Sequence, residues 1–276
     1  MTAPLEHVVV HPAPPELRTW CLCAIVRRVH AGPLHSLVQA NTWACLNTIV
    51  SGEVHGHDSV LPPRFVTGPF PSPFQTCVPE SLASVSLVLQ PWLLPPLTGR
   101  AAPELAGRVA DVAQLRSGVL DVLCDASEEA CDEGTLAPLW AAVAAQVASR
   151  QHGAPALALD ALARHGVAAA AEALGCGARQ YLRRFRGAMG LPPATWLRIR
   201  RWEAAVASLA GPEPASLAEL SLRHGFSDQA HLARDTRAIA DASPARLRQL
   251  LRDKAGHWSL QPAHVRLIQD GDDARP

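Results

Sequence analysis

The spacing of the apolar residues changes along this 276-residue chain, and that change limits the fold more than any other feature. Up to about residue 100, short runs of aliphatic and β-branched residues alternate with proline and glycine, which is typical of strands joined by tight turns. From Pro103 onwards, apolar residues recur at the three- and four-residue spacing of one helix face. The sequence therefore predicts an α+β chain, with a β-rich domain followed by helices.

The clearest strands are predicted at residues 8–10, 49–50 and 85–89, as parts of a sandwich or barrel. Further along, Leu105, Val109, Val112 and Leu115 follow a helical period. Residues 125–134 are predicted to form an acidic break, and residues 136–147 a further helix. Residues 151–254 are predicted to be entirely helical.

Composition excludes several classes of protein. Hydrophobic residues make up 48% of the chain and charged residues 18%, which is globular rather than disordered. No apolar run reaches the roughly 18–20 residues that cross a bilayer, and the N-terminus lacks the pattern of a signal peptide. Seven irregularly spaced cysteines favour reduced thiols, so we expect a cytoplasmic protein. Phosphate-loop, dinucleotide-binding, zincin and nucleophile-elbow motifs are missing, so we expect no enzyme activity and no cofactor.

Charge is divided unevenly between the two halves of a chain whose net charge is zero. Residues 1–150 carry 8 arginines and 13 acidic residues, whereas residues 151–254 carry 15 basic and 9 acidic residues. Between Cys176 and Arg201 there are seven arginines and no acidic residue. This division suggests two domains, the second of which faces a polyanion.

The basic region contains a short helix, a glycine turn and a second helix. Gly175-Cys176-Gly177 forms the turn, and a helix is predicted over residues 178–189 with Gly177 as its N-cap. Tyr181, Phe185 and Met189 share its inner face. The outer face carries Arg179, Gln180, Arg183, Arg184 and Arg186. In such a helix–turn–helix unit, the second helix enters the major groove of DNA.

A similar unit follows after a connecting helix at residues 193–209. Its first helix ends at His224-Gly225, Phe226 packs in the turn, and Ser227 or Asp228 caps a helix over residues 229–240. Leu232 and Ile239 point inward on that helix. Gln229, Ala230, Ala233, Arg234 and Arg237 are left on its outer face.

These motifs resemble the AraC/XylS family of transcriptional regulators over roughly residues 155–250. The likeness rests on Arg183-Arg184-Phe185-Arg186 before Gly190-Leu191-Pro192-Pro193, on His224-Gly225-Phe226-Ser227-Asp228-Gln229, on Leu232-Ala233-Arg234-Asp235 and on Ser243-Pro244. The resemblance implies a double helix–turn–helix domain that binds double-stranded DNA and contacts RNA polymerase, as activators do. It also implies an N-terminal cupin-like β-barrel that senses a small-molecule effector.

Three positions depart from the family pattern. Gly177 replaces the usual capping serine, which costs only a few tenths of a kcal/mol. Thr236 replaces an aromatic residue, and Asp241 replaces the usual glycine before Ser243-Pro244. The loss of core volume at position 236 predicts a weaker or less rigid second unit.

Side-chain chemistry assigns roles on DNA. Arginine bridges guanine O6 and N7, and glutamine bridges adenine N6 and N7, so Arg179, Arg183, Gln229 and Arg234 are candidate base readers. Arg184, Arg186, Arg198, Arg200, Arg201 and Arg237 are candidate phosphate contacts. The DNA-binding set of the prediction is Arg179, Gln180, Arg183, Arg184, Arg186, Arg201, Gln229, Arg234 and Arg237.

The predicted organisation is a β-rich sensor or dimerisation domain at 1–100, a helical connector at 101–150 and an AraC-type DNA-binding domain at 155–252. One protomer should recognise an asymmetric site, so a palindrome would need a homodimer. Trp20, Trp43 and His57 are candidate effector-pocket residues. The alternative to an effector sensor is a metal- or redox-sensing N-terminal domain, which would use His55 with His57, or Cys21 with Cys23 on one strand face. A scaffold that has lost DNA binding is a third hypothesis.

Overall fold

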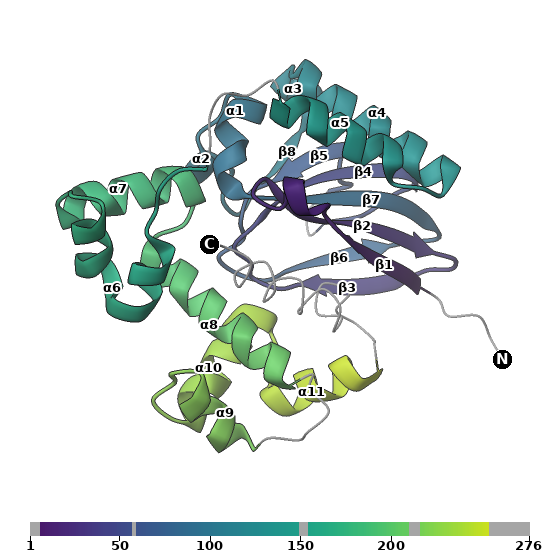
Figure 1. The fold of residues 1–276 in the computed structure, drawn as a ribbon. Coiled ribbons are helices and arrows are strands. Elements are labelled where there is room, and N and C mark those ends of the chain that lie inside the picture. The colour runs from purple at the N-terminus through teal and green to yellow at the C-terminus, as the bar shows by residue number, and fades with distance from the viewer. Residues whose placement is uncertain (1–5, 57–58, 149–153, 210–215, 254–276) are drawn as a thin grey trace.

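The computed structural model describes residues 6–56, 59–148, 154–209 and 216–253. Two antiparallel sheets occupy the N-terminal half, and a chain of helices follows (Figure 1). The α+β class with a β-rich domain before a helical helix–turn–helix region is therefore confirmed. In the described part of the chain, no helix combines the length and the apolar character needed to cross a membrane.

The main sheet has six strands in the order β1-β2-β7-β4-β5-β8. Their bounds are β1 Glu6–Pro12, β2 Cys21–Val29, β4 Ala44–Gly52, β5 Arg64–Thr67, β7 Leu82–Leu89 and β8 Val109–Asp111. A second sheet pairs β3 (Leu34–Val38) with β6 (Phe74–Val78). The predicted strands at 8–10, 49–50 and 85–89 are confirmed as parts of β1, β4 and β7.

The two faces of the main sheet bury different residues, because side chains alternate along each strand. Leu46 and Leu87 point into a core that also contains Leu120 of α4 (Gly118–Glu133) and Leu139 of α5 (Ala137–Ala148). These two helices cover that face (Figure 1). On the opposite face, Cys45 and Val88 form a separate cluster.

A β-bulge separates Cys21 from Cys23. The register of β2 against β7 shifts between these residues, so Cys21 joins the core under the helices while Cys23 joins the opposite face. The expectation that both thiols share one strand face is therefore wrong, because a bulge reverses the alternation of side chains.

Two expectations about the connector are also wrong. Residues 125–133 are not a break but the second half of α4, since small residues such as Ala130 and Cys131 pack on the core. Arg64 lies 2.7 Å from both Asp125 and Glu128, which partly neutralises the acidic face. The helical period through Leu105–Leu115 is interrupted by β8, which pairs with β5. Short helices flank it, namely α2 Ala102–Leu105 and α3 Val112–Leu115. The helix predicted at 136–147 is confirmed as α5.

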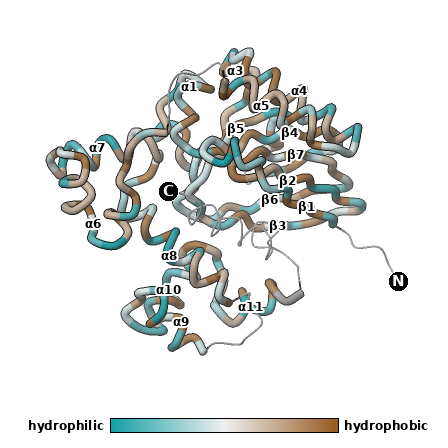
Figure 2. Tube along the Cα trace, in the orientation of Figure 1, coloured by the Kyte–Doolittle hydropathy of each residue, from teal (hydrophilic) through white to brown (hydrophobic). Residues whose placement is uncertain are grey.

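The C-terminal helices are α6 Leu159–Ala173, α7 Ala178–Met189, α8 Pro193–Leu209, α9 Leu217–Arg223, α10 Gln229–Ala240 and α11 Pro244–Asp253. The bounds predicted for α7, α8 and α10 are confirmed, whereas residues 154–158, which were also expected to be helical, are not. Gly166 breaks α6 with φ 82° and ψ −172°, as the predicted helix end at His165-Gly166 requires. Hydrophobic residues recur along the strands, whereas hydrophilic residues recur along α7 and α10 (Figure 2).

The β-rich half contacts the helical half at both helix–turn–helix units. The Ala40 amide donates a hydrogen bond of 2.9 Å to the Ile239 carbonyl near the end of α10. Ala40 is fully buried in the core of the second unit. At the end of α7, Gly190 lies so close to Pro69 and Ala102 that an added Cβ would be about 3 Å from each. The segment η2 (Pro91–Leu93) also packs near α7, where Trp92 touches the core of the first unit.

Candidate nucleic-acid interface

The first unit is held by an aromatic stripe on the inner face of α7. Tyr181, Phe185 and Met189 are buried, and the Phe185 ring packs edge-on against Trp196 of α8 at 5.8 Å. The Tyr181 hydroxyl donates to the Leu157 carbonyl at 2.9 Å, and burial raises the pKa of Tyr181 to about 12. These contacts fix α7 so that its other face points to solvent.

That outer face is strongly basic and not internally neutralised. Gly177 is the N-cap as predicted, but its residue type offers no side-chain hydrogen bond. All five predicted residues on this face are exposed: Arg179, Gln180, Arg183, Arg184 and Arg186. Within the described residues, none of these five has a hydrogen bond or ion pair to another side chain. Their donors are therefore available to an external polyanion.

In the second unit, a polar side chain caps the N-terminus of each helix. Ser216 and Glu219 form a reciprocal capping box at the start of α9, and hydrogen bonds from the Ser216 backbone and hydroxyl lower the pKa of Glu219. Asp228, rather than Ser227, caps α10, because its carboxylate accepts from the His231 amide at 2.6 Å. Leu232 and Ile239 are buried. The predicted DNA-facing residues of this helix are exposed: Gln229, Arg234 and Arg237.

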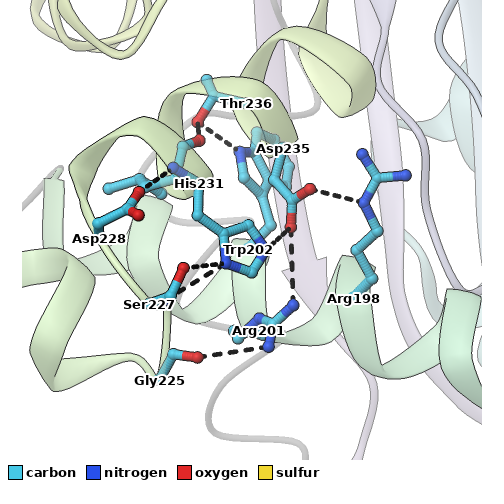
Figure 3. A network of polar contacts seen from close by, with 10 residues as sticks. Arg198, Arg201, Trp202, Gly225, Ser227, Asp228, His231, Asp235 and Thr236 are labelled. Carbon is cyan, nitrogen blue, oxygen red and sulfur yellow. Dashed lines mark hydrogen bonds and ion pairs between the residues drawn. The ribbon is translucent and has the colours of Figure 1, made fainter.

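A buried carboxylate ties α8 to α10 (Figure 3). Asp235 is 5% exposed and accepts from Arg198 Nε at 2.8 Å. Arg201 Nη2 and His231 Nε2 lie 3.7 and 3.5 Å from its other oxygen, at ion-pair distance. Arg201 also donates to the Gly225 carbonyl and lies over the Phe226 ring. This network orients α10 against the connecting helix.

Arg198, Arg200 and Arg201, which are predicted to contact phosphate, therefore also have intramolecular partners. Arg200 pairs with Glu203 at 2.8 Å and lies over the Trp196 ring. Phosphate contact by these three arginines stays a prediction. Sequence reasoning overlooked Asp235 as the acceptor that organises them. The i,i+4 spacing of His231 and Asp235 was the one local signal of this network. The contact with Arg198 had none, because Arg198 is 37 residues from Asp235 in the chain.

Thr236 is accommodated by hydrogen bonds in place of aromatic volume. It is fully buried, its hydroxyl accepts from Trp202 Nε1 at 3.2 Å, and it donates to the Leu232 carbonyl at 2.7 Å. The polar atom of each side chain is thus satisfied inside the core. The expected weakness of the second unit at this position stays a prediction.

Replacing Arg201 by alanine is expected to lower the free energy of unfolding of the helical domain by about 1 kcal/mol. The loss is limited because the side chain is 35% exposed and solvent screens its ion pair. If Arg201 also contacts phosphate, the salt slope of DNA binding, which is the slope of log affinity against log salt concentration, becomes shallower by about one unit. Urea denaturation measures the first effect and binding at several salt concentrations the second. An unchanged unfolding free energy would contradict the structural role of Arg201.

Asp241→Gly is expected to stabilise the second unit by about 0.5–1 kcal/mol. Asp241 ends α10 in the left-handed region, with φ 47°, where glycine is free of strain. Its negative charge also lies at a helix C-terminus, which the helix dipole disfavours. Asp241→Asn is the control, because it removes the charge and keeps the side chain. Thermal or urea unfolding measures both variants, and a lower stability of Asp241→Gly would contradict the expectation.

Together, two helix–turn–helix units with exposed basic second helices and one connecting helix define a double helix–turn–helix DNA-binding domain. Residues 170–250 match the family described as "Helix-turn-helix domain". This domain is of the AraC type. The class is that of transcription regulators. No curated protein matches this chain.

Solved structures of ToxT from Vibrio cholerae are similar to this chain, with low sequence identity. One from strain O395 is 9% identical and covers 83% of this chain and 97% of ToxT, with a TM-score of 0.44. Another, bound to (E)-4-(8-methylnaphthalen-1-yl)but-3-enoic acid, is 10% identical and covers 90% and 99%, with a TM-score of 0.44. A third, with an unsaturated fatty acid bound, is 9% identical and covers 83% and 95%, with a TM-score of 0.43.

The metal or redox alternative gains no support from the described residues. They contain no group of three or more histidine, cysteine or acidic side chains that could hold a metal ion. His55 pairs with Glu53 at 2.7 Å on the surface, and His57 lies outside the described residues. Burial raises the pKa of Cys21 and Cys45 to about 12 and also raises that of Cys23. Thiols in such surroundings stay protonated and unreactive at neutral pH.

A cavity of about 90 Å³ lies between the two sheets. Ile25, Cys45 and Ser84 line it from the main sheet, and Phe74 and Thr76 line it from β6. Of the three candidate pocket residues, Trp43 lines this cavity. Trp20 does not, because it packs against Trp92 at 5.0 Å beside the core under the helices, and His57 lies outside the described residues.

Proposed function

We propose that this protein is a sequence-specific transcription regulator that reads DNA with α7 and α10 in successive major grooves, about 10 bp apart. The observation that carries the proposal is the exposed outer face of each helix, where arginines have no partner in the described residues. Arg179, Arg183, Gln229 and Arg234 contact base edges, and the remaining arginines position the domain on phosphates. The regulator activates transcription through contact with RNA polymerase.

The N-terminal domain makes the regulator responsive to a small ligand. The inter-sheet cavity supports this part of the proposal, since it is mainly apolar and lined from both sheets. A ligand can shift the protein between DNA-competent and incompetent arrangements only if its affinity for the two differs. A palindromic operator would be occupied by a homodimer.

The test is selection of bound fragments from a random duplex pool by the purified full chain, repeated at several salt concentrations. We expect an asymmetric motif that spans two helical turns, with a steep salt dependence. A motif that spans one turn would restrict base reading to one unit. Salt-sensitive binding without any enriched motif would overturn sequence-specific recognition.

A further inference from the structure

Two short segments of the β-rich domain touch both the inter-sheet cavity and the two recognition helices, α7 and α10. Asn41 and Phe70 line the cavity, and the backbone amide of Asn41 donates a hydrogen bond of 2.9 Å to the backbone carbonyl of Phe70. Their chain neighbours Ala40 and Pro69 contact the DNA-binding domain. We call Ala40, Asn41, Pro69 and Phe70 the bridge.

The bridge meets each recognition helix at its C-terminal end. Ala40 donates its amide hydrogen to the Ile239 carbonyl at 2.9 Å, one residue before α10 ends. Pro69 lies against Gly190, the C-cap of α7, where an added Cβ would lie 3.0 Å from Pro69 Cγ. A shift of the bridge would therefore change the spacing of the two helices that read DNA.

The cavity wall indicates an uncharged ligand. Arg27 is its one charged lining residue among those described, and it is only 7% exposed. Its guanidinium already donates to Glu6 at 2.6 Å and to Ser36 at 2.9 Å, so its charge is neutralised. A charged ligand would lose its hydration in a mainly apolar space without gaining a free counter-ion.

One wall residue has an unused hydrogen-bond acceptor. Asn41 is 4% exposed, and its Nδ2 donates to the Gln39 carbonyl at 3.3 Å. Its Oδ1 atom is buried and accepts no hydrogen bond from the described residues. A buried acceptor without a partner is costly, and a ligand donor that reached it would remove that cost.

We propose that the cavity takes a small, uncharged, mainly apolar ligand that donates a hydrogen bond to Asn41, and that the bridge transmits its binding to both recognition helices. The inference deepens the proposed ligand response and rests on it. Cavities of about 150 Å³ bind benzene. The present 90 Å³ suits a five-membered ring.

Pyrrole, furan and pyrrole-2-carboxylate form a matched set of probes for the ligand class. Pyrrole has an N–H donor, furan has nearly the same shape without one, and the third probe adds a charge. Ligand-observed NMR on the full chain, without DNA, measures binding of all three. We expect pyrrole to bind about ten-fold more tightly than furan, and the carboxylate to bind most weakly. Equal binding of pyrrole and furan, or tighter binding of the carboxylate, would overturn the ligand class.

Asn41→Leu is expected to remove the preference for pyrrole over furan, because the variant has no acceptor at this position. Its thermal unfolding is compared with that of the native chain to establish that the domain is folded. Since the comparison of pyrrole with furan on the native chain needs no variant, it decides the ligand class even if Asn41→Leu does not fold. A folded Asn41→Leu chain that still prefers pyrrole would contradict the role of Asn41.

Gly190→Ala and Gly175→Ala test the bridge as a matched pair. Both glycines have positive φ, 74° and 61°, but only a Cβ at Gly190 would press on Pro69, since nothing lies within 4 Å of one at Gly175. In the native chain, saturating pyrrole should alter affinity for the selected DNA by about five-fold or more. We expect Gly190→Ala to lose this response and Gly175→Ala to keep it.

Amide hydrogen exchange gives a readout that needs no DNA. Pyrrole should change the protection of amides at the ends of α7 and α10, around Gly190 and Asp241, in the native chain. Bound pyrrole with unchanged exchange at both helix ends would overturn the coupling and leave the proposed function intact. Absence of an enriched DNA motif would instead overturn the proposed function, while the exchange data still decide the coupling.

Discussion

Phe185→Ala is expected to lower the free energy of unfolding of the DNA-binding domain by about 3–5 kcal/mol. Phe185 is fully buried, lies 5.9 Å from the Tyr181 ring and 5.8 Å from the Trp196 ring, and thereby joins α7 to α8. Alanine would leave a cavity between two helices that can close only in part. Most domains are stable by only about 5–15 kcal/mol, so this loss removes a large share of the total.

Urea denaturation followed by circular dichroism measures this loss. Leu182→Ala is the matched control, since Leu182 lies on the same helix and its side chain is 42% exposed. We expect its effect on unfolding to stay within about 0.5 kcal/mol. Similar losses for both variants would contradict the assignment of inner and outer faces on α7.

Arg183→Ala is expected to weaken binding to the selected DNA by about 1–3 kcal/mol and to relax specificity at one base pair. Arg183 is exposed at the middle of α7 and has no partner among the described side chains. Its guanidinium is therefore free to bridge guanine O6 and N7, a contact that alanine cannot make. The folded domain should be unaffected, because Arg183 takes no part in the core.

Arg183→Lys separates charge from geometry. Lysine keeps the positive charge but lacks the planar fork of donors that matches guanine. We expect this variant to keep the salt slope of the native protein and to lose base discrimination at the same position. Competition binding with the selected fragment and with single-base variants of it measures both properties. Equal losses on selected and random DNA would reassign Arg183 to a phosphate contact.

The helices of the DNA-binding domain could be predicted closely from the sequence, because their signals are local. Glycine turns, capping residues and a four-residue apolar period placed α7 and α10 at the bounds that the structure has. The same local reasoning missed β3 and β6, which have only five residues each and pair across a long stretch of chain. It also misplaced residues 125–133, since their acidic side chains do not show that the small residues between them are buried.

The sequence by itself determined the order of the two domains, the helix–turn–helix units and the basic outer faces, because periodicity and charge are properties of neighbouring residues. Only the tertiary structure decided which polar groups meet. Asp235 gathers Arg198 and Arg201 from another helix, and Ala40 reaches Ile239 across the domain boundary. Such contacts join residues far apart in the chain, so their partners depend on how whole elements pack and not on any local pattern.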